Sequence, residues 1–146
     1  MEAFPHHYKV NTVAKAEGEV ATSSEGLADI AVTAPAEFGG DGKHWSPETL
    51  LVAAVADCFV LSFKAIARAS RFEWHALRCE VEGVLDRDEK ILRFVQMKSK
   101  ATLEVKQGAD LDKARRLLDK AEHNCLITNS LNSEFVGEFE VLEIDE

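Results

Sequence analysis

The sequence predicts an α+β fold organised around one long apolar helix over residues 46–69. Two further observations support this class. Short segments of alternating apolar and polar residues occur in runs on both sides of the helix, which is typical of antiparallel strands. An amphipathic helical pattern over residues 110–123 follows the second run of strands. The length of 146 residues favours a single domain, residues 1–146.

The central helix is predicted to begin at Ser46 and to be buried. Ser46 can cap the first free amides, Pro47 suits the first helical position, and Glu48 places a negative charge at the positive end of the helix dipole. Residues 50–61 are apolar on nearly all sides, as in helices that are buried or span a membrane. Polar residues interrupt the run before it reaches the roughly 20 residues of a membrane span. We therefore expect a core helix that a chain of this length has difficulty covering alone.

The flanking elements are predicted from their periods and turn residues. Alternation predicts strands over residues 8–15, 17–23, 27–32, 77–86, 91–105 and 134–144. Residues 33–45 form a glycine-containing loop that is long enough to be functional. Asn124 is expected to end the amphipathic helix and to cap a short helical turn that begins at Cys125.

The composition limits the partners and the compartment. A formal net charge of −9 argues against a nucleic acid or an anionic membrane surface as partner, since both bind clusters of Lys and Arg. No apolar signal segment follows Met1, so we expect a cytoplasmic protein. In that compartment a pair of cysteines is more often catalytic or redox-active than a structural disulfide.

The three cysteines have different contexts and form no CxxC pair or metal-finger spacing. Cys79 lies on the inward side of an alternating strand and Cys58 lies within the apolar helix, so each can be simply a small buried side chain. Nothing about a position in the middle of a helix lowers a thiol pKa. Cys125 is expected at a helix start, facing the core and two residues after His123, where amides and a cation favour the thiolate.

Four short segments combine into a pattern that extends over most of the chain. They are Phe38-Gly39-Gly40, Ser46-Pro47-Glu48-Thr49-Leu50-Leu51, Ala56-Asp57-Cys58 and Cys125-Leu126-Ile127-Thr128-Asn129-Ser130-Leu131. Together they resemble the OsmC/Ohr family, which contains the osmotically inducible protein C and the organic hydroperoxide resistance proteins. The predicted order of strands and helices agrees with that family.

The resemblance implies an intertwined homodimer in which antiparallel sheets wrap around two central helices. It also implies a thiol peroxidase that reduces small organic hydroperoxides in oxidative-stress defence, with no metal, haem or flavin cofactor. By position in the motifs, Cys58 corresponds to the attacking cysteine, Cys125 to the resolving cysteine and Glu48 to the acidic active-site residue. The attacking thiolate becomes a sulfenic acid, which condenses with the second thiol to a disulfide. An external dithiol, lipoyl-bearing in the better-known branch, reduces that disulfide.

Glu48 and Cys58 are ten residues apart in the predicted helix. This is roughly 15 Å along a straight helix, and the two side chains lie on different faces. Unless the helix start is bent, Glu48 is therefore expected to serve the Cys58 of the partner subunit.

The sequence departs from the family pattern at the arginine that stabilises the attacking thiolate. The two branches supply it where this chain has Ala16-Glu17-Gly18 or Glu37, and the first arginine here is Arg68. Lys43 or His44 in the glycine loop can act as a substitute cation, without the planar fork of a guanidinium. The alternative is that both are ordinary solvated charges.

The sequence is therefore compatible with three functions. The first is the thiol peroxidase. The second is a relative without efficient peroxidase activity, which binds an apolar small molecule at the dimer interface and whose cysteines are merely buried. The third is a Cys/His metal site, for which His6 and His7 have no partner ligands at useful spacing. Loss of two thiols per chain on mixing with an organic hydroperoxide distinguishes the first from the second.

Overall fold

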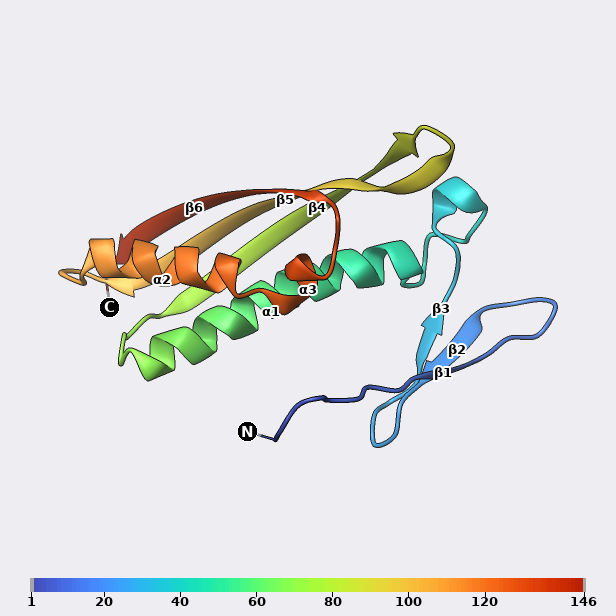
Figure 1. Cartoon of the computed structure of the whole chain (residues 1–146), viewed down its shortest axis with the longest axis horizontal. Helices are drawn as coiled ribbons and strands as arrows, with labels where there is room; N and C mark the ends of the chain where they lie inside the picture. The colour runs from blue at the N-terminus through green and yellow to red at the C-terminus, as the bar shows by residue number, and fades with distance from the viewer. Residues whose placement is uncertain (1, 146) are drawn as a thin grey trace. The chain divides into compact units, whose positions relative to one another are not determined.

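The computed structural model describes residues 2–145, which form two compact units, one before Leu51 and one from Leu51 onward. Each unit has its own three-stranded sheet (Figure 1). Two sheets and three α-helices within the described residues make this a mixed α+β protein, as the sequence predicts.

The N-terminal unit is a small antiparallel meander. Strands β1 (Asn11–Val13), β2 (Val20–Ser23) and β3 (Ile30–Val32) pair in chain order. The predicted meander is confirmed, but its strands are shorter than expected, because only three residue pairs join each pair of neighbours. The loop that follows contains one 3₁₀ turn, η1 (Ala36–Phe38).

Helix α1 spans Pro47–Ala69, and its predicted start is confirmed. The Thr49 N–H donates to Oγ of Ser46 at 3.1 Å, which is an N-cap. The buried side chains recur every four residues and form one stripe: Val55, Phe59, Phe63 and Ala67. By length and composition alone α1 is able to cross a membrane, which is weak evidence because core helices of soluble proteins have the same properties.

The C-terminal unit has a sheet of β4 (Ala76–Asp88), β5 (Ile91–Lys106) and β6 (Glu134–Ile144), in that order. Strands β4 and β5 form the predicted antiparallel hairpin. Strand β6 pairs with β5 in parallel, so the expectation of antiparallel sheets throughout is wrong here. The reason is the connection, since the chain passes through a helix before β6 begins, and parallel neighbours need such a crossover.

Two helices follow β5 before the chain enters β6. Helix α2 (Leu111–His123) is capped by Asp110, and α3 (Leu126–Asn129) is a single turn. Asn124 is the C-cap of α2, as predicted, but Cys125 rather than Asn124 is the N-cap of α3. The Asn129 N–H donates to the Cys125 carbonyl at 3.0 Å, so the first helical bond of α3 is accepted by Cys125.

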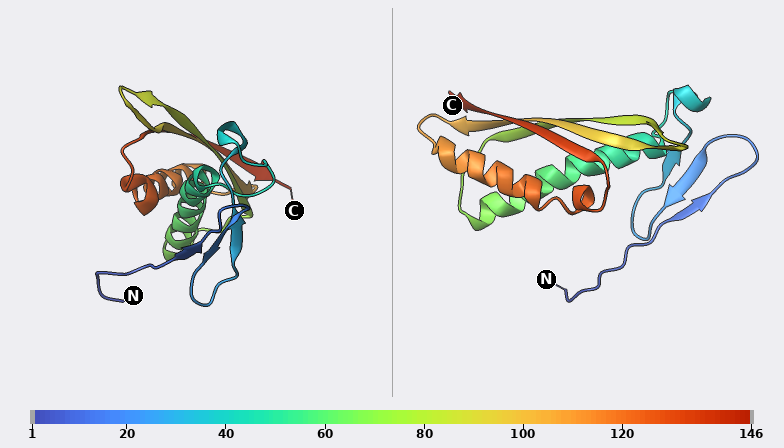
Figure 2. Two further views of the ribbon diagram at one scale, coloured as in Figure 1. Left: turned by 90° about the vertical axis from the view of Figure 1, so that its right-hand side faces the viewer. Right: turned by 45° about the horizontal axis from the view of Figure 1, so that its top comes forward.

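The core of the C-terminal unit lies between its helices and its sheet. Figure 2 shows α1 and α2 on one side of the β4–β6 sheet. The fully buried residues of this core are Phe59, Phe63, Ala67, Ala101, Leu103, Val105, Ala114, Leu117, Leu118 and Ala121. Charged side chains alternate with the inward residues along β4 and β5, which places them on the opposite face.

Candidate active site

Cys58 and Cys125 lie beside each other in the C-terminal unit. Cys58 is half-buried on α1, directly before the core residue Phe59. Cys125 is only 2% exposed, at the junction of α2 and α3. Cys58 is near enough to Cys125 to raise its pKa, and both thiols are free. The fold therefore brings a cysteine of the central helix near a cysteine that lies more than 60 positions later in the chain.

Burial raises the pKa of the Cys125 thiol, and the neighbouring Cys58 raises it further. A hydrogen bond from Oγ1 of Thr128 to Sγ of Cys125, 3.2 Å long, acts in the opposite direction. The expected contribution of an amide is present, since the Thr128 backbone N–H also lowers the pKa, but the net shift is upward and His123 is not among its causes. His123 is exposed, with Nδ1 3.2 Å from the Asp119 carbonyl oxygen, and desolvation outweighs the single turn of helix that follows Cys125.

Cys79 is a third thiol in the same region. It lies half-buried on β4, with Sγ 3.5 Å from Oγ of Ser99 on the neighbouring strand. Burial raises the pKa of Cys79, and the charges of Cys125 and Asp57 raise it further. The prediction that Cys79 lies on the inward face of its strand is confirmed.

Glu48 occupies the first turn of α1 and lines a pocket of about 420 Å³ in the N-terminal unit. Its Oε1 atom is buried and has no hydrogen-bond partner among the described residues. Most of the lining is apolar or carries a single hydroxyl: Thr12, Val20, Thr22, Val32, Thr33, Ala34, Pro35, Phe38, Pro47 and Leu50. A carboxylate oxygen in such a pocket can accept a hydrogen bond from an O–H or N–H group of a small molecule.

Lys43 and His44 lie in the loop before α1, and Asp41 engages both. Nδ1 of His44 is 2.8 Å from Oδ2 of Asp41, and the Lys43 backbone N–H donates to Oδ1 at 2.8 Å. The Lys43 amide and His44 hold the pKa of Asp41 below its usual value. The pairing with Asp41 partly offsets the charge that His44 can offer to a thiolate. The side chain of Lys43 is exposed.

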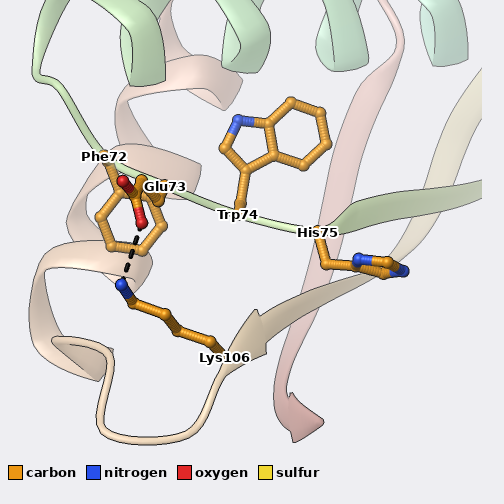
Figure 3. A pocket seen from close by; sticks show the side chains of 5 residues that line it. All are labelled: Phe72, Glu73, Trp74, His75 and Lys106. Atoms are coloured by element: carbon orange, nitrogen blue, oxygen red, sulfur yellow. Dashed lines mark hydrogen bonds and ion pairs between the residues drawn. The ribbon is translucent and has the colours of Figure 1, made fainter. Parts of the chain in front are cut away.

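A second pocket, of about 430 Å³, lies near the junction of α1 and β4 (Figure 3). Phe72 and Trp74 contribute aromatic faces, and Nζ of Lys106 pairs with Oε2 of Glu73 at 2.9 Å. That contact lowers the pKa of Glu73. None of the predicted site residues lines this pocket, and its ion pair is exposed.

No three His, Cys, Asp or Glu side chains between residues 2 and 145 are grouped so that they could hold a metal ion.

Comparison with known proteins identifies relatives that share the fold. A family model described as OsmC-like protein matches residues 40–140. An uncharacterized protein of Acinetobacter baylyi is 30% identical over 123 residues, 84% of this chain and 83% of its own. A Vibrio cholerae OsmC-like protein of unknown function has a TM-score of 0.83 at 18% identity, covering 92% of this chain and 99% of its own. An organic hydroperoxide resistance protein OsmC from Legionella pneumophila has a TM-score of 0.73 at 22% identity, covering 97% of this chain and 100% of its own. Because the family model matches well over half of the chain and includes Cys58 and Cys125, this protein belongs to the OsmC-like family.

Proposed function

We propose that this protein is a cytoplasmic thiol-dependent peroxidase that reduces small organic hydroperoxides in oxidative-stress defence. The observation that carries the proposal is that two free thiols, half-buried Cys58 and buried Cys125, are near enough for Cys58 to raise the pKa of Cys125. Family membership adds support, since some structural neighbours are named organic hydroperoxide resistance proteins.

The chemistry needs only the two thiols and a hydroperoxide. The Cys58 thiolate attacks the terminal peroxide oxygen, the O–O bond breaks, and the alkoxide leaves and takes a proton as an alcohol. Cys58 is then a sulfenic acid. The Cys125 thiol attacks this sulfur, a disulfide forms and water leaves, so that two thiols are oxidised for each peroxide reduced. An external dithiol, a lipoyl-bearing protein in our proposal, returns both cysteines to the reduced form by exchange.

The proposed assembly is a homodimer in which α1 of one subunit packs against α1 of the other. The support is the composition of α1, an apolar helix whose most hydrophobic window is only 22% buried within one chain. In this dimer the pocket of one subunit would receive the apolar part of the hydroperoxide, with Glu48 accepting the peroxide O–H beside the partner's Cys58.

The absence of the family arginine argues for a slower attack than in the arginine-containing relatives. A thiolate without a cation is less populated at neutral pH. Lys43 and His44 are the proposed substitutes for the arginine. If either cation stabilises the Cys58 thiolate, replacing that residue by Gln should slow the attack of Cys58 on the hydroperoxide. Unchanged rates in both variants would exclude the two residues from this role.

The deciding experiment counts thiols after mixing reduced protein with an organic hydroperoxide. The wild type should lose two thiols per chain, Cys58→Ser should lose none, and Cys125→Ser should lose one and accumulate a sulfenic acid that dimedone traps. Thiols that persist in the wild type would refute the peroxidase. Persistent thiols would instead favour the alternative function, a protein that binds an apolar small molecule. Measuring whether the protein retains an alkyl ligand would then test that alternative.

A further inference from the structure

The pocket that Glu48 lines contains a carboxylate without a basic side chain to balance it. Every lining residue belongs to the N-terminal unit, from β1 to the first turn of α1. Within the described chain, Glu48 is the one charged residue of this lining, and no Lys, Arg or His contributes to it. We propose that the pocket binds a small organic cation, a primary alkylammonium whose apolar body fills the pocket and whose N–H groups donate to Glu48. This inference goes beyond the proposed function, because it requires no cysteine and no redox step.

The lining of the pocket suits the apolar body of such a ligand. Strand β2 contributes Val20, β3 contributes Val32 and the 3₁₀ turn contributes Phe38. Val32 is buried and Phe38 is exposed, so the lining extends from the interior of the unit to its surface. The volume of about 420 Å³ lies within the usual range of small-molecule pockets.

Glu48 supplies the polar end of the pocket. Its Oε1 atom is buried and has no hydrogen-bond partner among residues 2–145. A buried carboxylate oxygen without a donor is costly, because its interactions with water are not replaced. The positive end of the α1 dipole stabilises a negative charge in the first turn but gives Oε1 no hydrogen bond. A ligand that brings an N–H donor to Oε1 therefore removes a cost that the protein already carries.

The charge of the carboxylate favours an ammonium over a neutral donor. An alcohol can donate one hydrogen bond to Oε1, whereas an ammonium donates the bond and also neutralises the carboxylate. The hydroxyls of Thr12 and Thr22, which also line the pocket, can accept further N–H bonds. A partly exposed ion pair of this kind corresponds to a preference of about fivefold. An anion with the same apolar body should bind least, because Glu48 repels it.

The test compares probes that share a hexyl chain and differ in the head group: hexylammonium chloride, hexanol and sodium hexanoate. Each is titrated into the isotope-labelled full-length protein, and the amide NMR shifts locate the site and give the Kd. We expect saturable shifts at the residues that line the pocket. Hexylammonium should bind about fivefold more tightly than hexanol, and hexanoate should bind most weakly. No saturable hexylammonium binding, or saturable shifts confined to residues outside the lining, would overturn the proposal.

Glu48→Gln is the deciding variant, because it removes the charge and keeps the size of the side chain. Hexylammonium should lose its advantage over hexanol in this variant, while hexanol still binds. Glu37→Gln removes an exposed carboxylate next to Phe38 that does not line the pocket, so it should leave the preference unchanged. A preference that persists in Glu48→Gln, or that disappears equally in Glu37→Gln, would contradict the proposal. The amide spectrum of each variant reports in the same experiment whether the protein is folded.

This proposal and the proposed function fail separately. Binding is measured without a hydroperoxide, and the double variant Cys58→Ser/Cys125→Ser should bind hexylammonium as tightly as the wild type. Loss of binding in the double variant would contradict the assignment of the site to the N-terminal unit alone. Thiols that resist a hydroperoxide in a protein that still binds hexylammonium would refute the peroxidase and leave the cation site intact.

Discussion

Burial, rather than a charged partner, sets the protonation of two of the three thiols. Thr128 donates to Cys125 and Ser99 contacts Cys79, yet desolvation is the largest influence on each and raises both pKa values. The thiolate is the nucleophile in disulfide chemistry. The step in which Cys125 attacks should therefore gain speed as the pH rises.

The free energy of unfolding is expected to decrease as the pH rises above about 8.5, the ordinary pKa of an unfolded thiol. Cys79 and Cys125 have raised pKa values in the folded protein, so the unfolded chain releases these protons first. The stability that these two thiols contribute is fully present below their pKa in the unfolded chain. It is lost as the pH rises through their pKa in the folded protein. Urea unfolding with reductant present measures the trend. The double variant Cys79→Ser/Cys125→Ser should have a flatter profile, and an unchanged slope would contradict this account.

Thr128→Val should raise the pKa of Cys125 further, because it removes the hydroxyl that donates to Sγ at 3.2 Å. One hydrogen bond to a charged acceptor is worth about 1.5–3 kcal/mol, and 1.4 kcal/mol corresponds to about one pKa unit. Alkylation of Cys125 against pH, in a background of Cys58→Ser and Cys79→Ser, measures the shift. Ser130→Ala, which removes a hydroxyl bonded to the Leu126 carbonyl instead, is the control. Equal profiles for both variants would mean that Thr128 does not act on the thiol.

At the scale of elements, α1 and β4 approach each other closely because of one glycine. A Cβ atom built on Gly83 would lie 2.7 Å from Cγ2 of Val52 and 3.0 Å from Cε1 of Phe94. Real Cβ atoms essentially never make a contact as short as the one with Val52, so α1 and β4 can be this near only with no side chain at position 83. The spacing of α1 and β4 beside Val52 depends on this contact.

Gly83→Ala should therefore destabilise the protein by about 1–3 kcal/mol, the usual cost of overpacking a core. Chemical denaturation provides the measurement. Glu82→Ala, at an exposed neighbouring position on the same strand, is the matched control and should change stability little. Comparable stability of both variants would show that α1 moves away from the strand at negligible cost.

The sequence was sufficient for the local features of the fold. The capping residue Ser46 and the alternation along β4 and β5 each depend on near neighbours, and each prediction is confirmed. The parallel pairing of β6 could not be predicted, because alternation gives the face of a strand but not the direction of its partner. The raised pKa of Cys125 could not be predicted either, since burial is a property of the whole unit.

At the scale of the whole molecule, one chain leaves much apolar surface uncovered. Leu61 on α1 is 61% exposed, and large apolar side chains of the N-terminal unit are exposed to a similar extent, among them Val13 at 68% and Leu27 at 69%. Exposed apolar patches of this kind on soluble proteins are typical of interaction surfaces. The proposed homodimer would cover at least the α1 part of this surface.

Leu61→Lys should shift the proposed dimer toward monomer, because it places a charge on the exposed apolar face of α1. Sedimentation over a range of protein concentrations measures the shift, with the wild type expected as a dimer. Glu138→Lys makes a larger charge change at an exposed position of β6 and should leave the dimer intact. A wild type that sediments as a monomer at all concentrations would refute the proposed assembly.

The position of the boundary between the two compact units affects how this chain can be divided. It falls between Leu50 and Leu51, four residues into α1 rather than in a linker. A cut there separates Ser46 from the helix that it caps and leaves the new first turn with unsatisfied amides. Neither half should be obtainable as a well-folded fragment by limited proteolysis or by cloning. Recombination at that point is therefore expected to yield two incomplete proteins.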